Sequence, residues 1–119
     1  MRKKPRILKT TTVATSRLFH IEALDLEFSN GTITQYERLR GATKGTVLIV
    51  PMLTRETVLL VREYAAGTER YELGFPKGRI ETDEPLLEAA NRELMEEVGY
   101  GATQLEHITS LTLAPGFLG

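Results

Sequence analysis

A run of glycines and charged residues between Gly78 and Tyr100 constrains this chain more than any other part of its sequence. It has the pattern G-x5-E-x7-R-E-x2-E-E-x-G, which begins at Gly78 and ends at Gly99. Seven letters are fixed, and with a background usage of roughly 6% each, a chance match at a given start has a probability of about 10⁻⁹. The pattern therefore points to a function that needs these residues together.

The second half of the run predicts an α-helix. Pro85 has a fixed φ that suits the first helical position, and Gly99 suits the left-handed residue that ends a helix. Asp83 and Glu84 carry negative charge next to the positive N-terminus. Apolar residues recur at spacings of three and four and predict a buried stripe: Leu87, Ala90, Leu94 and Val98.

Three carboxylates of the pattern fall on one side of this helix. At 100° per residue, Glu93, Glu96 and Glu97 lie within roughly 100° of one another. Their mutual repulsion is relieved by a divalent cation, and hard carboxylate oxygens suit Mg²⁺ or Mn²⁺. A solvated acidic face is the ordinary alternative for a glutamate-rich helix, but the other fixed letters favour a metal site.

Gly78 and Arg92 have separate predicted roles in the same site. Gly78 lacks a side chain, so its backbone can approach a ligand or metal closely. Arg92 lies four residues from both Glu88 and Glu96 and is predicted to orient the acidic group. As an isolated surface ion pair it would contribute only ~0.5 kcal/mol.

The residues before the run predict β-structure. Residues 18–39 read as a β-hairpin with a tight primed turn at Asn30-Gly31, and the basic residues 2–6 as a solvated arm. Residues 46–52 and 57–62 are nearly all apolar, which suits strands buried on both faces of a mixed sheet.

Two further strands are predicted, over residues 71–75 and 105–113. Pro76-Lys77-Gly78 is expected to stop the first of them. Together with the helix, these elements predict an α/β sandwich. Gly41 to Gly45 is the predicted linker, so we divide the chain into an N-terminal arm and hairpin, 1–44, and a second domain, 45–119. Because residues 114–119 have a loop composition, we expect the second domain to be truncated at its C-terminus.

Composition excludes several classes of function. The net charge of −1 does not favour nucleic acid as a partner, and no apolar stretch approaches membrane-spanning length. The 119 residues contain no cysteine, which excludes disulfides and fits a cytoplasmic protein.

The pattern matches the Nudix box, and the chain resembles a Nudix hydrolase of the ADP compounds hydrolase (NudE-type) branch. The resemblance covers residues 6–119 and is carried outside the box by Ser16-Arg17-Leu18-Phe19, LDLEFSNG (24–31), YERLR (36–40), LVREYAAGTERYELGFPKG (60–78) and LAPG (113–116). It implies an α/β/α sandwich and Mg²⁺-dependent hydrolysis of ADP-ribose, NADH or diadenosine triphosphate to AMP and a second phosphate. It also implies a homodimer formed through the N-terminal hairpin. Pro115, sixteen residues after Gly99, matches a position associated with ADP-ribose-cleaving members.

The resemblance also implies a role for each residue of the box. Arg92 would steer the glutamates and Glu84 would be an accessory acid. Several Mg²⁺ ions would polarise the phosphates and activate a water molecule. The implied metal ligands are Glu93 and Glu97, Glu96 directly or through water, and the carbonyl of Gly78.

Four residues outside the box are candidates for substrate binding. Arg62 is predicted to face the phosphates, with an ion pair to Glu63 or Glu72 as the alternative. Tyr36 and Arg38 are predicted to contact adenine or a phosphate, with hairpin packing as the alternative. Glu72 is predicted to contact substrate or a metal-bound water.

Two other functions stay open. The same box can serve an oxidised nucleoside triphosphate or a capped RNA 5′ end, although the net charge argues against RNA. A non-catalytic nucleotide-binding fragment is the alternative from a different class.

Overall fold

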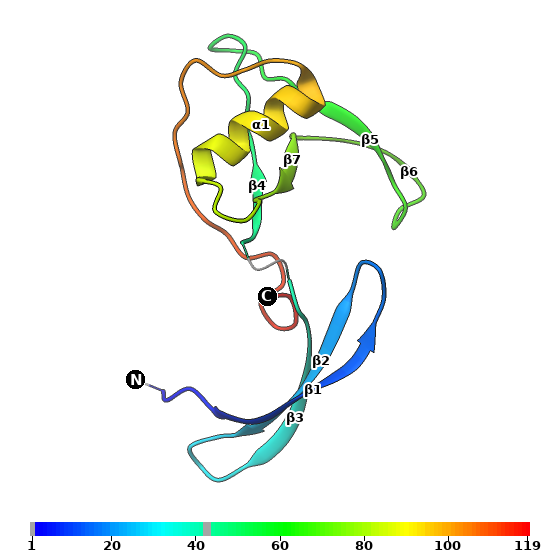
Figure 1. Ribbon diagram of the computed structural model, residues 1–119, viewed down its shortest axis with the longest axis vertical. Helices are drawn as coiled ribbons and strands as arrows, with labels where there is room; N and C mark the ends of the chain where they lie inside the picture. Colours follow the sequence, from blue (N-terminus) through cyan, green and yellow to red (C-terminus); the bar gives the residue numbers. More distant parts are fainter. Residues whose placement is uncertain (1, 42–43) are drawn as a thin grey trace. The chain divides into compact units, whose positions relative to one another are not determined.

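The computed structural model describes residues 2–41 and 44–119 (Figure 1). The chain divides into two compact units, Met1–Gly41 with Ser110–Gly119, and Ala42–Thr109. Residues 110–119, which the sequence assigned to the second domain, thus group with the first unit. The predicted linker includes residues 42 and 43, which lie outside the described part of the chain.

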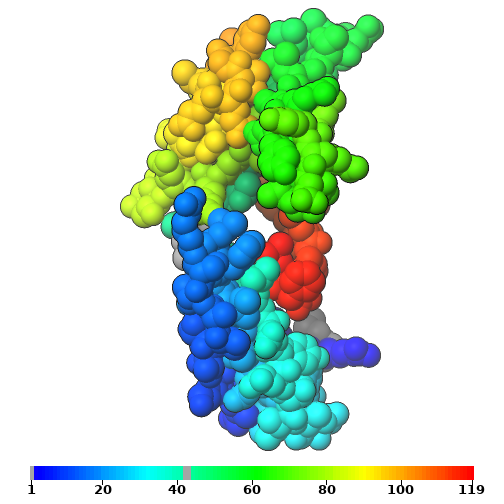
Figure 2. Space-filling view, turned by 90° about the vertical axis from the view of Figure 1, so that its right-hand side faces the viewer, coloured from blue at the N-terminus to red at the C-terminus, as the bar shows by residue number. Residues whose placement is uncertain are grey.

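The first unit is a three-stranded antiparallel sheet in the order β1-β2-β3. Its strands are β1 (Arg6–Thr15), β2 (His20–Glu27) and β3 (Ile33–Leu39). The predicted hairpin is confirmed as β2 and β3, but β1 was not predicted. Every residue of β1 is exposed, as the blue strand on the surface in Figure 2 illustrates. The β-branched residues of β1 favour a strand, and the edge of β2 supplies its hydrogen-bond partners.

The turn between β2 and β3 differs from the predicted primed turn. Gly31 has a φ of +85°, while Asn30 is not among the described residues with positive φ. The amide of Gly31 donates to the Phe28 carbonyl, and the amide of Phe28 donates to the Thr32 carbonyl. These bonds define a three-residue loop with one left-handed glycine, the next most common hairpin connection.

The C-terminal segment pairs with the edge of β3. Leu39 and Leu118 form a parallel bridge, and the Leu39 amide donates to the Phe117 carbonyl at 2.7 Å. The predicted strand over residues 105–113 is wrong, because these residues have no assigned strand partner in the described chain. Ile108, Leu111 and Leu113 are consequently exposed.

The second unit contains two antiparallel strand pairs and one helix. β4 (Thr46–Leu48) pairs with β7 (Lys77–Arg79), and β5 (Val61–Ala65) pairs with β6 (Arg70–Gly74). The predicted strand over residues 71–75 is confirmed as β6, which ends at Gly74 before Pro76, but β7 was not predicted.

The expectation of strands buried on both faces is also wrong. Val47 and Ile49 are buried, whereas Leu48 between them is 61% exposed. The described residues bury only the face of β4 that meets the helix, so an apolar run is not evidence of burial on both sides.

The helix α1 (Leu86–Val98) packs on β4 and β7. It ends as predicted at Gly99, whose φ is +79° and whose amide donates to the Met95 carbonyl. Pro85 is the residue just before the helix rather than its first residue. The core that joins helix to sheet contains Val47, Ile49, Ala89, Ala90 and Leu94.

Leu87 does not belong to the buried stripe, since it is 40% exposed while Ala89 is fully buried. The α/β architecture with an N-terminal β-sheet is confirmed. The described residues contribute one helical layer, and their named sheets are antiparallel rather than mixed. No helix in residues 2–41 and 44–119 is long and apolar enough to cross a membrane.

Candidate active site

The carboxylates of Glu93 and Glu97 face the short strand β7. The Lys77 amide donates a hydrogen bond to Glu97 Oε2 at 3.2 Å. A Cβ atom added to Gly78 would overlap the Glu93 carboxylate, so this approach requires a glycine at position 78. Two carboxylates one helical turn apart therefore meet the backbone of Lys77 and Gly78.

The surroundings of Glu97 disfavour its negative charge. Burial raises the pKa of the Glu97 carboxyl, and the like charges of Glu63 and Glu93 raise it further, against the opposing hydrogen bond from Lys77. Sequence reasoning placed Glu63 only as a possible partner of Arg62. Its effect on Glu97 depends on how β5 and the helix meet, for which the sequence offers no signal.

Arg92 joins the helix to the loop before it. Its guanidinium donates to both Glu84 oxygens, from Nε at 2.7 Å and from Nη2 at 2.9 Å, and also to the Arg79 carbonyl at 2.9 Å. Nη1 donates to Glu93 Oε1 at 2.9 Å and to Glu96 at 3.3 Å. The predicted orienting contacts to Glu93 and Glu96 are thus present. Among the described contacts of Arg92, however, the expected pairing with Glu88 is replaced by Glu84, because the loop folds back onto the helix.

The Glu84 carboxylate is held in its ionised form by this contact. The hydrogen bond from Arg92, supported by the amide of Glu81, lowers the pKa of Glu84 from 4.5 to about 2. Glu84 thus connects the loop to Arg92, and Arg92 in turn contacts Glu93.

This depressed pKa predicts an acid-dependent loss of stability. Because the folded pKa lies below the ordinary value, the stabilisation from Glu84 is complete above about pH 4.5 and is lost as the pH falls toward about 2. We expect Glu84→Gln to lower the melting temperature at neutral pH, and the difference from the unmodified chain to shrink with acid. Thermal unfolding followed by circular dichroism at several pH values measures this. Glu88→Gln, with the same charge change on the exposed side of α1, is the control, and a gap independent of pH would contradict the assignment.

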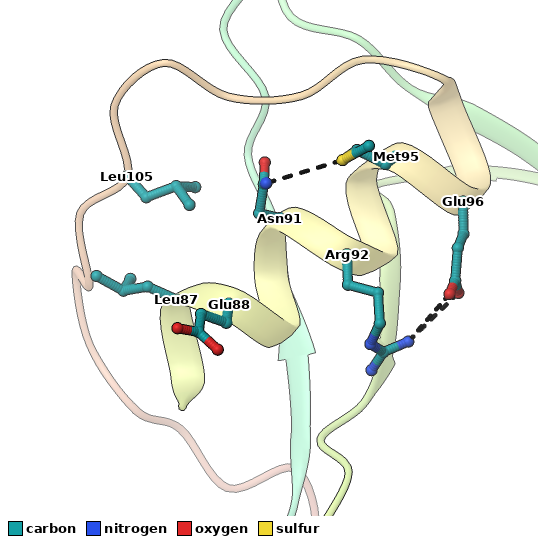
Figure 3. A pocket seen from close by; sticks show the side chains of 7 residues that line it. All are labelled: Leu87, Glu88, Asn91, Arg92, Met95, Glu96 and Leu105. Atoms are coloured by element: carbon teal, nitrogen blue, oxygen red, sulfur yellow. Dashed lines mark hydrogen bonds and ion pairs between the residues drawn. The ribbon is translucent and has the colours of Figure 1, made fainter. Parts of the chain in front are cut away.

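Glu96 shares the Nη1 nitrogen of Arg92 with Glu93. Its side chain is 58% exposed and pairs with Arg92 (Figure 3). It borders an open pocket of about 530 Å³. The lining residues come from α1 and the segment after it: Leu87, Glu88, Asn91, Arg92, Met95, Glu96 and Leu105. Since Glu93 and Glu97 do not line this pocket, it is separate from the acidic pair.

The acidic pair suits a divalent metal ion. Within residues 2–41 and 44–119, no group of three or more histidine, cysteine, aspartate or glutamate side chains is close enough to hold one. The Glu93 carboxylate instead occupies the space that a side chain at position 78 would fill, and the Glu97 carboxylate accepts a hydrogen bond from the Lys77 amide. Both carboxylates supply the hard oxygen donors that Mg²⁺ and Mn²⁺ prefer. The residues therefore fit such an ion, with Glu93 and Glu97 as its carboxylates.

The predicted residues outside the box lie in different parts of the chain. Arg62 and Glu72 are on β5 and β6, where Glu72 pairs with Arg70 and accepts a hydrogen bond from Thr68. The alternative pairing of Arg62 with Glu63 or Glu72 does not appear among the ion pairs of the described residues.

Tyr36 and Arg38 are on β3, in the other compact unit. Tyr36 packs against Phe28, with ring centroids 6.2 Å apart, and Arg38 pairs with Glu22. Their role in substrate binding stays a prediction.

Comparison with known proteins identifies the two parts of the chain. Residues 42–118 match the NUDIX domain, and residues 5–38 match the NudE-type Nudix hydrolase N-terminal domain. The chain therefore belongs to the Nudix family, whose members are typically metal-dependent.

Three known proteins show how far the similarity extends. The chain is 53% identical to the ADP compounds hydrolase NudE of Escherichia coli (strain K12), over 97% of this chain and 61% of that protein. It is 30% identical to the ADP-ribose pyrophosphatase of Bacillus subtilis (strain 168), over 92% of this chain and 61% of that protein. A crystal structure of an ADP compounds hydrolase is similar with a TM-score of 0.91 and 52% identity, over 99% of this chain and 63% of that one. The fold is thus the Nudix fold, and the chain spans about three fifths of the length of these relatives.

Proposed function

We propose that this chain is part of a Mg²⁺-dependent pyrophosphohydrolase that cleaves ADP-linked compounds to AMP and a second phosphate. One observation carries the proposal: in a chain with a NUDIX domain, the Glu93 carboxylate lies against Gly78 and the Glu97 carboxylate accepts a hydrogen bond from the Lys77 amide. The similarity to ADP compounds hydrolases supports the substrate class.

Glu93, Glu97 and the carbonyl of Gly78 would hold Mg²⁺ or Mn²⁺, with Glu96 as a further ligand directly or through water. When bound, the metal supplies charge neutralisation at the phosphates and a water molecule of lowered pKa. Arg92 fixes Glu93 by a 2.9 Å hydrogen bond, and Glu84 fixes Arg92 through both of its oxygens. These residues prearrange the acidic pair before substrate arrives.

The proposal extends to binding partners and location. The substrate is a small nucleotide compound, with Arg62, Glu72, Tyr36 and Arg38 as candidate contacts, rather than a nucleic acid. We include a homodimer formed through the N-terminal hairpin and a cytoplasmic location, both supported by the resemblance to the NudE branch.

Product analysis tests the reaction. The purified chain is incubated with Mg²⁺ and ADP-ribose, NADH or diadenosine triphosphate, and AMP is separated by ion-exchange chromatography. We expect AMP from the ADP-linked compounds and little hydrolysis of an oxidised nucleoside triphosphate or capped RNA. The E. coli ADP compounds hydrolase serves as positive control. Absence of AMP under conditions where that control is active would contradict the proposal, and a preference for the triphosphate or RNA would favour the alternative Nudix function.

A further inference from the structure

The loop between β2 and β3 contains an asparagine that is open to chemical change. Asn30 is followed by Gly31, and both residues are exposed. Asparagine is among the thermolabile residues, because the backbone nitrogen of the next residue can attack its side-chain amide. A glycine in that next position leaves the nitrogen unhindered. A Cβ atom added to Gly31 would meet no atom within 4 Å, so the space beside this residue is also open in the folded loop.

The loop also polarises the Asn30 side chain. Its Oδ1 accepts a hydrogen bond from the Thr32 amide at 3.0 Å. A donor at this oxygen stabilises the negative charge that forms on it when the side-chain carbonyl carbon is attacked. The Gly31 amide donates to the Phe28 carbonyl at 2.9 Å, so that bond must open before the nitrogen can react. Opening requires a local change in an exposed loop and not the unfolding of the sheet.

Two cations lie beside this loop. β1 runs antiparallel to β2 with Arg6 opposite Glu27, so the residues before Arg6 run beside those after Glu27. Arg2 and Lys3 line a hollow of about 780 Å³ together with Asn30, and the other described residues that line it are uncharged. The neighbouring Glu27 is already paired with Arg6 at 3.0 Å. The lining of the hollow therefore carries two positive charges that no acid of the same lining neutralises.

We propose that Asn30 is a site of spontaneous deamidation, and that the carboxylate formed there pairs with Arg2 and Lys3. The deprotonated nitrogen of Gly31 bonds to the side-chain carbonyl carbon of Asn30, and the side-chain nitrogen takes up a proton and leaves as ammonia. Water then opens the resulting five-membered succinimide. Its addition at one carbonyl gives aspartate, and at the other gives isoaspartate, whose main chain passes through the former side chain. The net reaction consumes one water molecule and releases one ammonia molecule.

The new carboxylate supplies the charge that the hollow lacks. In both products OH replaces the side-chain NH₂, and the acid is ionised at neutral pH. One negative charge beside Arg2 and Lys3 ties the N-terminal arm to the β2–β3 loop, whereas the neutral amide of Asn30 offers no ionic partner.

Mass spectrometry of the whole chain tests the modification. The folded protein is kept at mildly alkaline pH, where more of the Gly31 nitrogen is deprotonated, and samples are digested at low pH. We expect the peptide that contains Asn30 to gain the mass difference between OH and NH₂, while the peptide that contains Asn91 stays unchanged. Asn91 is an internal control because it lies within α1, where the helix holds the following amide of Arg92.

Asn30→Gln keeps a side-chain amide but would have to form a six-membered ring, so this variant should lose the conversion. An Asn30 that stays intact, conversion of Asn91 to the same extent, or conversion at position 30 in Asn30→Gln would each overturn the proposal.

The pairing is tested on Asn30→Asp, which has the charge of the aspartate product. Carbon-13 NMR follows the titration of the new carboxyl in the whole chain. Because nearby cations favour the ionised acid, Arg2→Gln combined with Lys3→Gln should raise the pKa of this carboxyl by about half a unit. Lys9→Gln is the matched control, since Lys9 lies opposite Asp25 and does not line the hollow, so the pKa should stay the same.

An unchanged pKa in the doubly substituted chain, or an equal rise with Lys9→Gln, would show that the pairing is wrong. Circular dichroism checks that each variant folds. If Asn30→Asp does not fold, the deamidated natural chain, separated by ion-exchange chromatography, replaces it. Neither test uses a metal ion or a nucleotide, so the results do not depend on whether the chain hydrolyses ADP-linked compounds.

Discussion

Replacing Glu97 by glutamine should abolish metal binding while leaving the metal-free protein as stable as before. Glutamine keeps an oxygen that can accept the Lys77 hydrogen bond but loses the charge that would bind Mg²⁺ or Mn²⁺. Loss of a residue that merely supports a metal ligand already costs about 10–100-fold, so loss of a ligand itself should lower Mn²⁺ affinity and the rate of AMP release by more than about 100-fold.

The sign of the stability effect follows from the pKa of Glu97. Because folding raises this pKa, ionisation of Glu97 disfavours the folded state, and its cost appears as the pH rises through the raised pKa. The neutral amide avoids that cost, so the melting temperature without metal should stay unchanged or rise slightly at neutral pH.

Electron paramagnetic resonance of free Mn²⁺ measures the binding, and calorimetry measures the melting temperature. Glu88→Gln, which removes the same charge from the outer side of the helix, should leave Mn²⁺ affinity nearly unchanged. If Glu97→Gln bound Mn²⁺ as the unmodified chain does, the assignment of Glu97 as a ligand would be wrong.

Gly78→Ala should have a comparably large effect on the site with a small effect on stability. The added Cβ would overlap the carboxylate end of Glu93. That end belongs to a flexible side chain, so Glu93 can rotate away, and we expect the free energy of unfolding to fall by no more than about 1 kcal/mol, the lower end of the cost of overpacking. The rotation, however, removes Glu93 from the backbone of β7 and from Arg92, so Mn²⁺ affinity should fall by about tenfold or more.

The matched control is Gly74→Ala, the same substitution at the end of β6. A Cβ at Gly74 meets no atom within 4 Å, so both Mn²⁺ affinity and stability should be retained. A Gly78→Ala variant that kept Mn²⁺ affinity would mean that the close approach of Glu93 to Gly78 is not needed for the site. A large loss of stability in the same variant would mean instead that Glu93 cannot move aside.

Local features were predictable because they depend on neighbours in the sequence. The end of the helix at Gly99 and the placement of β2 and β3 follow from a left-handed glycine and a turn-forming Asn-Gly pair, both of which act over a few residues. The pairing of β1 was missed and a strand at 105–113 was wrongly expected. A strand needs a partner edge, and which edge is available is decided by residues far away in the sequence.

The sequence alone determined two things: the helical spacing of Glu93, Glu96 and Glu97, and the family of the chain. Both follow because the box fixes residue types at set intervals. The tertiary structure decided how those residues are used. Packing of α1 on β7 brings Glu93 and Glu97 to the backbone of Lys77 and Gly78, while Arg92 bonds Glu93 and Glu96 through one nitrogen. Helical periodicity sets the angle between side chains, but only packing against a second element decides which of them approach a common point.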